Sequence, residues 1–294
     1  MDIRPFFLTF SQSFDPLNIC FSFFVFFLPS SVIRIDGINM LHNIHDLLDF
    51  AIQIADKAGK HTLAYYQSSY EIETKSDNSP VTIADREAEQ LLRSEIEKTF
   101  PDHQILGEEF APKETDSPFK WIIDPIDGTK SFITGVPFYS NLLALEYQGE
   151  IILGISNFPA LNEMYYAAKG IGAFMNGKTI KVSGTKEISN SRIMVTDVRS
   201  LENAEKGIQA KSILNDSYFY RTWADAYGYA LVASGRADAM FDPKMNPWDG
   251  APFAIILKEA GGYFGDWNGV ETIYGENAFS SNFILKEEIL KRLK

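Results

Sequence analysis

The stretch Trp121–Lys130, with the sequence WIIDPIDGTK, places two carboxylates, a proline, a glycine and a hydroxyl directly after an apolar run. Its first three residues have the pattern of a buried strand, so we expect Asp124 where the strand ends and a loop begins. Pro125 fixes one backbone angle, and Gly128 lets the backbone approach a ligand closely. Asp124 and Asp127 can then face one point, where two carboxylates need a cation between them. The stretch therefore predicts an all-oxygen metal site, most naturally for Mg²⁺. A plain strand ending in an Asx or proline turn would give the same string.

The composition is that of a soluble globular protein of one or two domains, with 294 residues, 45% hydrophobic and 22% charged. The net charge of −12 argues against nucleic acid or an anionic membrane as a partner. Cys20 is the only cysteine, which excludes disulfide scaffolds, thiolate metal sites and cysteine nucleophiles from the body of the protein. We expect a cytoplasmic protein.

Residues 1–39 differ from the rest of the chain. They hold nine of the 23 phenylalanines, and Ile19–Leu28 is an almost pure apolar run. That run is shorter than the ~20 residues of a membrane span. Its basic flank is weak, and no A-x-A cleavage site follows. We expect translation to start at Met40, with residues 1–39 a gene-model artefact; a targeting or anchor segment is the alternative. Residues 40–294 are expected to form a single domain.

The remaining sequence mixes helical and strand patterns. Two helices are predicted first, from Met40 to about Gln67 and from a cap at residues 79–82 to about Phe100. Strand patterns follow at Gln104–Leu106, Lys120–Ile123, several places within residues 141–168, Arg192–Thr196, Tyr218–Arg221 and Ala237–Phe241. Helical patterns follow at Ala204–Leu214, Ala226–Ser234 and Pro247–Ala260. This order predicts stacked α and β layers in one compact α+β unit.

Acidic residues occur at four predicted element ends that are far apart in sequence. They are Asp85, Glu108 with Glu109, Asp124 with Asp127, and Asp249. Each has an ordinary interpretation taken alone. Asp249 could be a helix N-cap, Asp85 a first-turn acid favoured by the helix dipole, and the glutamates a solvated loop.

Taken together, these segments resemble the inositol monophosphatase superfamily in order and spacing. The matching segments are Ser79–Asp85, Gly107–Glu109, Asp124–Thr129, Trp248–Asp249 and Glu259–Gly262. The resemblance runs from about Leu41 to the C-terminus. It implies a layered αβαβα sandwich of the inositol monophosphatase or sugar phosphatase type, usually a homodimer. Such an enzyme hydrolyses phosphate monoesters with two or three Mg²⁺ ions.

The resemblance also implies the metal ligands. Glu108, Asp124 and the carbonyl of Ile126 would hold the first metal. Asp124, Asp127 and Asp249 would hold the second. A phosphate monoester dianion repels a nucleophile, so clustered metals that concentrate positive charge and activate a water suit this reaction.

The same resemblance implies the catalytic groups. Phosphate would lie against the backbone amides of Gly128 and Thr129. The Thr129 hydroxyl, bonded to Asp85, would orient the attacking water, with Glu108 completing the catalytic set. Glu109 would support a third, weaker metal. Positioning and charge stabilisation supply most of the rate in such chemistry, so no serine–histidine or cysteine mechanism is needed.

The substrate is suggested by the residues before the final Trp-Asp pair. Residues 221–229 and 242–249 look most like the histidinol-phosphatase branch of the superfamily, although Ala224 replaces an expected glycine and Ala226 an expected cysteine. The candidate substrate contacts are Arg221, Asp225, Asp242 and Asp249. The extra carboxylates suit an ammonium or imidazolium group, and histidinol phosphate carries both.

Three alternatives remain at this stage. Carboxylates also accept hydrogen bonds from hydroxyls, so inositol monophosphate is the second candidate. A bisphosphate nucleotide or sugar ranks third, because Lys130 and Arg221 are the only obvious cations for a second phosphate. A non-catalytic, metal-dependent binding protein is a different class of function. It is disfavoured because each expected metal ligand, and the Asp85–Thr129 pair, is present.

Overall fold

The computed structural model describes residues 43–69, 72–74, 80–223 and 225–294. The part of the chain from His42 to Lys294 forms one compact unit. The predicted N-terminal extension, the start at Met40 and the departure at Ala224 lie outside the described residues. Within the described part of the chain, none of the helices combines the length and apolar character that a membrane span needs.

Two long helices, α1 (Ile44–Tyr65) and α2 (Ile83–Thr99), confirm the first two helical predictions. A short antiparallel pair, β1 (Ile72–Thr74) and β2 (Pro80–Thr82), lies between them in sequence. The apolar face of α1 is buried because its small and branched residues recur at helical spacing. Thr82 caps α2 in a capping box with Asp85, so one catalytic candidate also stabilises the start of its own helix.

A seven-stranded sheet has the order β3-β4-β5-β6-β7-β8-β9, in which β3 and β4 are parallel and the other pairs antiparallel. The strands are β3 (Gln104–Gly107), β4 (Phe119–Asp127), β5 (Ser140–Tyr147), β6 (Glu150–Phe158), β7 (Glu163–Ala168), β8 (Gly172–Met175) and β9 (Lys178–Thr179). Two-residue turns join β5 to β6 and β8 to β9, so these strands pair with their neighbours in sequence. Because β3 and β4 are parallel, their carboxyl ends lie at the same end of the sheet.

The strand that carries the two carboxylates is longer than predicted. β4 continues past Ile123, pairs Asp124 with Leu142, and resumes pairing at Asp127 after a shift of register. Pro125 falls in this irregularity, where the ladder needs no N–H donor. The expectation that Asp124 follows the end of the strand is therefore wrong, because both carboxylates lie within β4.

A second sheet has the order β11-β10-β12-β14-β13. Its strands are β10 (Arg192–Val195), β11 (Phe219–Arg221), β12 (Ala239–Asp242), β13 (Gly262–Gly265) and β14 (Ala278–Asn282). β10 runs parallel to both β11 and β12. The carboxyl ends of these three strands therefore meet at one edge. β13, β14 and the C-terminal helix α8 (Phe283–Arg292) were not predicted from the sequence.

Helices fill and cover the space around the two sheets. They are α3 (Thr129–Ile133), α4 (Val198–Asn203), α5 (Gly207–Asp216), α6 (Ala226–Ala233) and α7 (Pro247–Glu259), with 3₁₀ turns at Pro159–Leu161 and Ile188–Asn190. The single helix predicted at Ala204–Leu214 corresponds to α5. α4 forms a separate turn, capped by Asp197 through the amides of Arg199 and Ser200.

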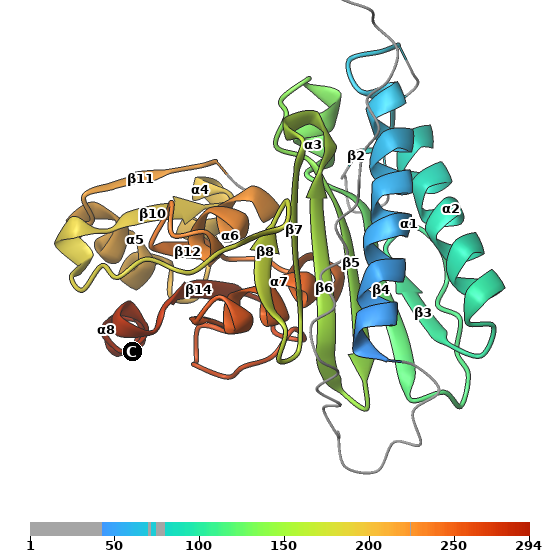
Figure 1. Cartoon of the computed structure of the whole chain (residues 1–294). Helices are drawn as coiled ribbons and strands as arrows, with labels where there is room; N and C mark the ends of the chain where they lie inside the picture. Colours follow the sequence, from blue (N-terminus) through green and yellow to red (C-terminus); the bar gives the residue numbers. More distant parts are fainter. Residues whose placement is uncertain (1–42, 70–71, 75–79, 224) are drawn as a thin grey trace, which may run out of the picture. The chain divides into compact units, whose positions relative to one another are not determined.

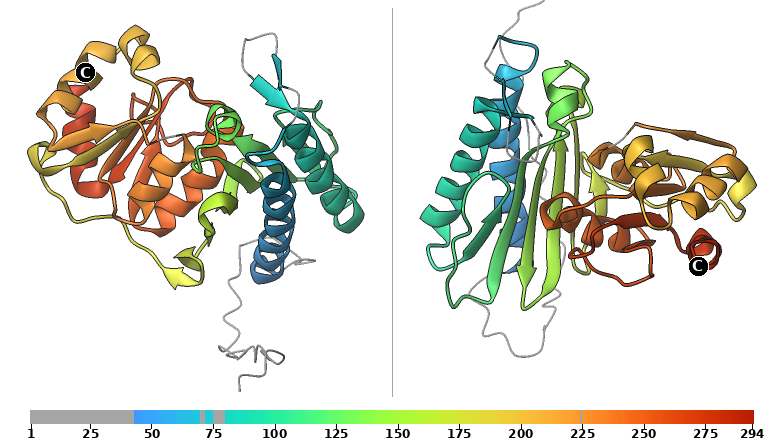
Figure 2. Two further views of the ribbon diagram at one scale, coloured as in Figure 1. Left: turned by 90° about the horizontal axis from the view of Figure 1, so that it is seen from above. Right: turned by 180° about the vertical axis from the view of Figure 1, so that it is seen from behind.

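The elements of residues 43–294 stack as five layers (Figures 1 and 2). α1 and α2 cover one face of the seven-stranded sheet, with a core of aliphatic residues and Trp121. α6 and α7 lie between the two sheets, and α7 is apolar around most of its circumference because both sides are covered. α5 and α8 cover the outer face of the five-stranded sheet. The fold is a layered αβαβα sandwich, as predicted.

Candidate active site

Three carboxylates converge at one end of the layers. Asp124 and Asp127 come from β4, and Asp249 comes from the first turn of α7, where it forms a capping box with Asn246. One oxygen from each of the three lies within 4.8 Å of the others. Residues more than a hundred positions apart therefore form the compact acidic cluster that the motifs predicted.

Asp124 has the environment of a metal ligand. The residue is buried, and its Oδ1 has no hydrogen-bond partner among the described residues. Burial, followed by the charges of Glu108, Asp127 and Asp249, raises the pKa of Asp124 well above its ordinary value. A divalent cation would reverse both effects, since it satisfies the orphan oxygen and favours the charged form. The donor set therefore fits a hard cation.

Two further predicted ligands flank this cluster. Glu108 follows β3 directly. Burial is the main cause of the raised pKa of Asp124 and of Asp249, which reaches about 6 in Asp249, and the charge of Glu108 adds to both shifts. Ile126 is fully buried, and its carbonyl accepts a hydrogen bond from the Thr129 hydroxyl at 3.1 Å. Glu108 and Ile126 therefore both lie next to the cluster of Asp124, Asp127 and Asp249, although Glu108 comes from another strand end.

The predicted catalytic pair also lies together. Asp85 accepts hydrogen bonds at Oδ2 from the amide and hydroxyl of Thr82, at 2.8 and 2.6 Å. Its Oδ1 faces the Thr129 hydroxyl at 3.5 Å. Burial is the main cause of the raised pKa of Asp85. One oxygen of this carboxylate thus caps α2, while the other approaches the cluster.

Gly128 connects β4 to the short helix α3. Its φ of 77° lies in the left-handed region that side chains disfavour, so glycine suits this turn. The predicted phosphate-binding amides of Gly128 and Thr129 therefore follow the metal carboxylates directly.

The five-stranded sheet contributes a second group of carboxylates. Asp242 ends β12 and is buried, where its Oδ1 accepts from the Thr196 hydroxyl at 3.2 Å and the Lys244 amide at 3.3 Å. The Tyr229 hydroxyl approaches its Oδ2 at 3.5 Å. Burial and the charge of Asp249 raise the pKa of Asp242 to about 8.

Asp225 links the two carboxylate groups. It precedes α6, and the amide of the next residue, Ala226, donates to Oδ2 of Asp127 at 2.8 Å. A Cβ on Gly128 would lie 2.9 Å from Oδ2 of Asp225. The pKa of Asp225 is raised, chiefly by burial. Asp225 therefore lies beside the predicted phosphate site.

Arg221 is placed differently from the other predicted substrate contacts. It is exposed, its Nη1 donates to the carbonyl of Tyr220 at 2.7 Å, and its guanidinium lies 5.3 Å from the centre of the Phe219 ring. In this conformation the side chain is turned along its own strand. Contact with a substrate would require another rotamer.

The histidines are occupied elsewhere. His103 accepts from the Trp121 indole at 3.1 Å, and His61 lies 3.0 Å from Glu87. These two histidines are therefore paired away from the acidic cluster.

One group that positions the site was missed in the sequence. Asn141 on β5 is buried, and its Nδ2 donates to the carbonyl of Pro125 at 2.6 Å and to the Thr62 hydroxyl at 3.3 Å. The bond supports the irregular part of β4 between the two carboxylates. The sequence did contain a signal for this contact, because an asparagine in an otherwise apolar strand needs a buried hydrogen-bond partner.

Comparison with known proteins agrees with this geometry. The model of the inositol monophosphatase family matches residues 43–293. The chain belongs to the inositol monophosphatase family. It is 45% identical over 237 residues to a histidinol-phosphatase of Chlorobaculum parvum, which covers 80% of this chain and 92% of the relative. It is 35% identical over 257 residues to a histidinol-phosphatase of Mycobacterium tuberculosis, covering 85% and 98%. The solved structure of a Thermotoga maritima IMPase aligns with a TM-score of 0.77 and 35% identity, covering 84% of this chain and 96% of that one.

Membership of the inositol monophosphatase family confirms the predicted reaction class. The protein is a phosphoric monoester hydrolase of a metal-dependent family, and its acidic cluster could bind a metal.

Proposed function

We propose that this protein is a Mg²⁺-dependent histidinol-phosphatase of histidine biosynthesis. The observation that carries the substrate assignment is the pair Asp225 and Asp242, a half-buried and a buried carboxylate beyond the metal cluster. Uncompensated buried carboxylates are costly, and a cationic ligand offsets that cost. Histidinol phosphate brings an ammonium and an imidazole to this position. The histidinol-phosphatases among the relatives support the same substrate.

The metal would be held by the first group of carboxylates. Glu108, Asp124 and the carbonyl of Ile126 would bind one Mg²⁺, and Asp124, Asp127 and Asp249 a second. Glu109 would support a third. When bound, Mg²⁺ would supply positive charge at the phosphate and make a nearby water a better nucleophile.

The chain's own groups would then orient the reactants. The amides of Gly128 and Thr129 would donate to phosphate oxygens as these gain charge. The Thr129 hydroxyl, with Asp85 accepting its proton in a hydrogen bond, would align the attacking water. Positioning of this kind can contribute several kcal/mol to a reaction that needs little covalent chemistry.

The second group of carboxylates would bind the leaving alcohol. Asp225 and Asp242 would pair with the cationic groups of histidinol, and Asp249 would contact the leaving side of the ester. Arg221 would contribute after a change of rotamer. A cation between Asp225 and Asp242 would lower the pKa of both groups, so substrate binding would be coupled to loss of a proton.

Inositol monophosphate is the alternative substrate. The same carboxylates can accept hydrogen bonds from a polyol, and the Thermotoga maritima structure is named as an IMPase. We also propose a cytoplasmic homodimer whose folded part is residues 40–294, without a nucleic-acid or membrane partner.

Phosphate release by the purified protein tests the assignment. L-histidinol phosphate and inositol 1-phosphate would be compared at saturating Mg²⁺, with EDTA as the control. We expect kcat/KM to favour histidinol phosphate about 100-fold, which corresponds to roughly 2.7 kcal/mol of selective transition-state binding. The reverse preference would assign the protein to inositol phosphate, and no hydrolysis of either ester would reject both substrates.

A further inference from the structure

α2 carries a second buried carboxylate, Glu89, one helical turn after Asp85. Its side chain is fully buried. Its Oε2 accepts the Glu109 amide at 2.7 Å, and its Oε1 approaches the Phe110 amide at 3.3 Å. A hydrogen bond from a backbone amide to an ionised carboxylate is stronger than one between two neutral groups. Glu89 therefore holds the loop that follows Glu108.

Gly107 makes this contact possible. A Cβ at this position would overlap the carboxylate of Glu89, whose Oε1 and Cδ occupy that space. The glycine that precedes Glu108 is thus explained by close approach of Glu89, because its φ does not lie in the left-handed region. The absence of a side chain on Gly107 leaves the space that the Glu89 carboxylate occupies.

Arg93 holds Glu89 from the other side. Its Nε donates to Oε1 of Glu89 at 2.7 Å, and its Nη2 donates to the carbonyl of Phe110 at 3.1 Å. The guanidinium also lies 5.9 Å from the centre of the Phe110 ring. The buried charge of Glu89 is therefore paired and hydrogen-bonded, which is the condition for retaining it in the interior. Glu89 and Arg93 therefore both form hydrogen bonds with the loop at residues 109–110.

We propose that Glu89 is a positioning residue for the metal site. It fixes residues 107–110 so that Glu108, which follows β3, faces Asp124 on the neighbouring parallel strand β4. α2 would then serve the site twice, through Asp85 near Thr129 and through Glu89 at the Glu108 loop. This inference rests on the proposed role of Glu108 as a metal ligand.

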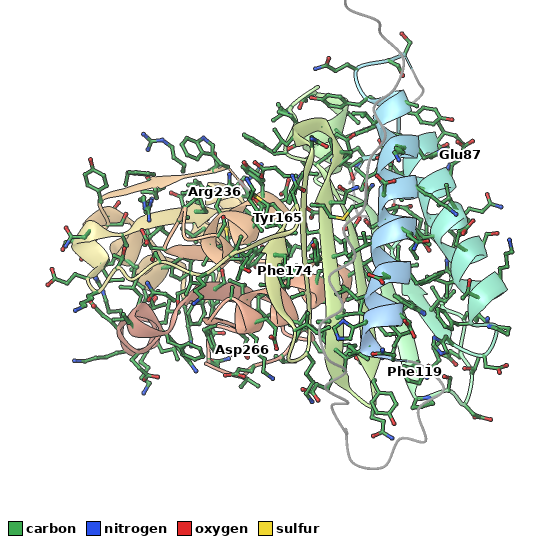
Figure 3. All side chains as sticks on the ribbon, in the orientation of Figure 1. Glu87, Phe119, Tyr165, Phe174, Arg236 and Asp266 are labelled. Atoms are coloured by element: carbon green, nitrogen blue, oxygen red, sulfur yellow. The ribbon has the colours of Figure 1, made fainter. Side chains whose placement is uncertain are left out.

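The test compares Glu89→Gln with a matched control, Glu146→Gln. Glu146 is also a buried, paired carboxylate, 2.6 Å from both Lys120 Nζ and the Tyr274 hydroxyl. Glu146 pairs with the start of β4, at the end of the strand where Figure 3 labels Phe119. The metal carboxylates lie toward the other end of β4, which leads into α3 (Figure 1). Both variants lose a buried charge, but only one of them touches the metal loop.

Three quantities would be measured on the full chain. They are the Mg²⁺ concentration for half-maximal hydrolysis of histidinol phosphate, the affinity for Tb³⁺ by luminescence without substrate, and Tm in EDTA. We expect Glu89→Gln to weaken Mg²⁺ activation and Tb³⁺ binding by about 10- to 100-fold, as is usual when a group supporting a metal ligand is lost. We expect Glu146→Gln to lower Tm but to leave both metal readouts within about twofold of the parent.

A second variant covers the case in which Glu89→Gln does not fold. Arg93→Lys keeps the positive charge but loses the forked contact to Glu89 and the Phe110 carbonyl. It should weaken Tb³⁺ binding in the same direction, by about threefold. Unchanged metal affinity in a folded Glu89→Gln or, failing that, in Arg93→Lys would overturn the positioning role. The Tb³⁺ titration decides this even if the parent hydrolyses neither ester, a result that would count against the proposed function alone.

Discussion

Carboxylates from the seven-stranded sheet and from the five-stranded sheet lie close together, yet their surroundings differ. Asp124 on β4 has an oxygen without a hydrogen-bond partner among the described residues, next to several other acids. Asp242 on β12 accepts hydrogen bonds from Thr196, Lys244 and Tyr229. The first environment leaves a carboxylate oxygen without a partner, whereas the second has hydrogen bonds from the protein but no ion pair among the described residues. We infer that the first sheet binds the metals and that the second recognises the substrate.

The comparison also explains why one family can serve several phosphate esters. The strand with Asp124 and Asp127 pairs with β5 at both carboxylates, pairs with β3 as far as Ile123, and is supported by the Asn141 side chain. The second group comes from strand ends and the loop before α6. Loop residues can change without disturbing a sheet. Under the proposed assignment, substrate choice would be separable from the metal chemistry.

The largest effect is expected from Asp124→Asn. The substitution removes the ligand that both proposed metals share, so kcat should fall by about 1000-fold or more, equivalent to roughly 4 kcal/mol. Phosphate release at saturating Mg²⁺ measures this loss. The apo protein should remain folded, because the change removes one of several repelling buried charges. A kcat near that of the parent would break the assignment of metal chemistry to the first sheet.

A smaller and selective effect is expected from Asp242→Asn and Asp225→Asn. Each should lower kcat/KM for histidinol phosphate by about 10- to 100-fold, because a hydrogen-bonded ion pair with the leaving group is lost. Hydrolysis of inositol 1-phosphate should change less, and the Mg²⁺ dependence should stay the same. Steady-state kinetics on both esters measures the difference. Equal losses on the two substrates would show that the second group does not select for charge.

The metal-free protein should lose stability as the pH rises. Folding raises the pKa of Asp249 from 3.8 to about 6 and that of Asp242 from 3.8 to about 8, so the folded state binds more protons than the unfolded state across this window. The free energy of unfolding therefore falls from about pH 4 to about pH 8. We expect Tm in EDTA to be several degrees lower at pH 8 than at pH 5.5.

Added Mg²⁺ separates the two carboxylate groups in that experiment. It should raise Tm more at pH 8 than at pH 5.5, because ligands must be deprotonated to bind metal. Asp242→Asn should reduce the fall in Tm between pH 6 and pH 8 in EDTA. A Tm in EDTA that rises over the same window would contradict the raised pKa values.

The smallest effect is expected where the two groups meet, at Gly128. Gly128→Ala must adopt a φ of 77° and places a Cβ 2.9 Å from the Asp225 carboxylate. The cost should be about 1 kcal/mol, seen as a drop in Tm of a few degrees. KM for histidinol phosphate should rise with it, because Asp225 is displaced. Gly149→Ala, at a positive φ of 86° with nothing nearby, is the matched control for backbone strain. Identical KM values in the two variants would mean that Asp225 tolerates the displacement.

The local sequence was enough to predict α1, α2, β3, the first part of β4 and the acidic motifs. Apolar residues at helical spacing and a Thr–Asp capping box are short-range signals, which act before any tertiary contact forms. The single cysteine also excluded thiolate metal ligands from the body of the protein. Residue type and spacing therefore determined which atoms could do chemistry.

Only the tertiary structure decided how these parts combine. β4 runs through Pro125 because pairing with β5 and the bond from Asn141 outweigh the missing donor of proline. Gly262–Gly265 was not predicted as a strand, yet it forms β13 because β14 pairs with it along its length. The approach of Glu89 to Gly107, and of Asp225 to Gly128, depends on contacts between distant segments. Such contacts leave no periodic trace in the sequence, because each needs a partner that only the folded chain brings near.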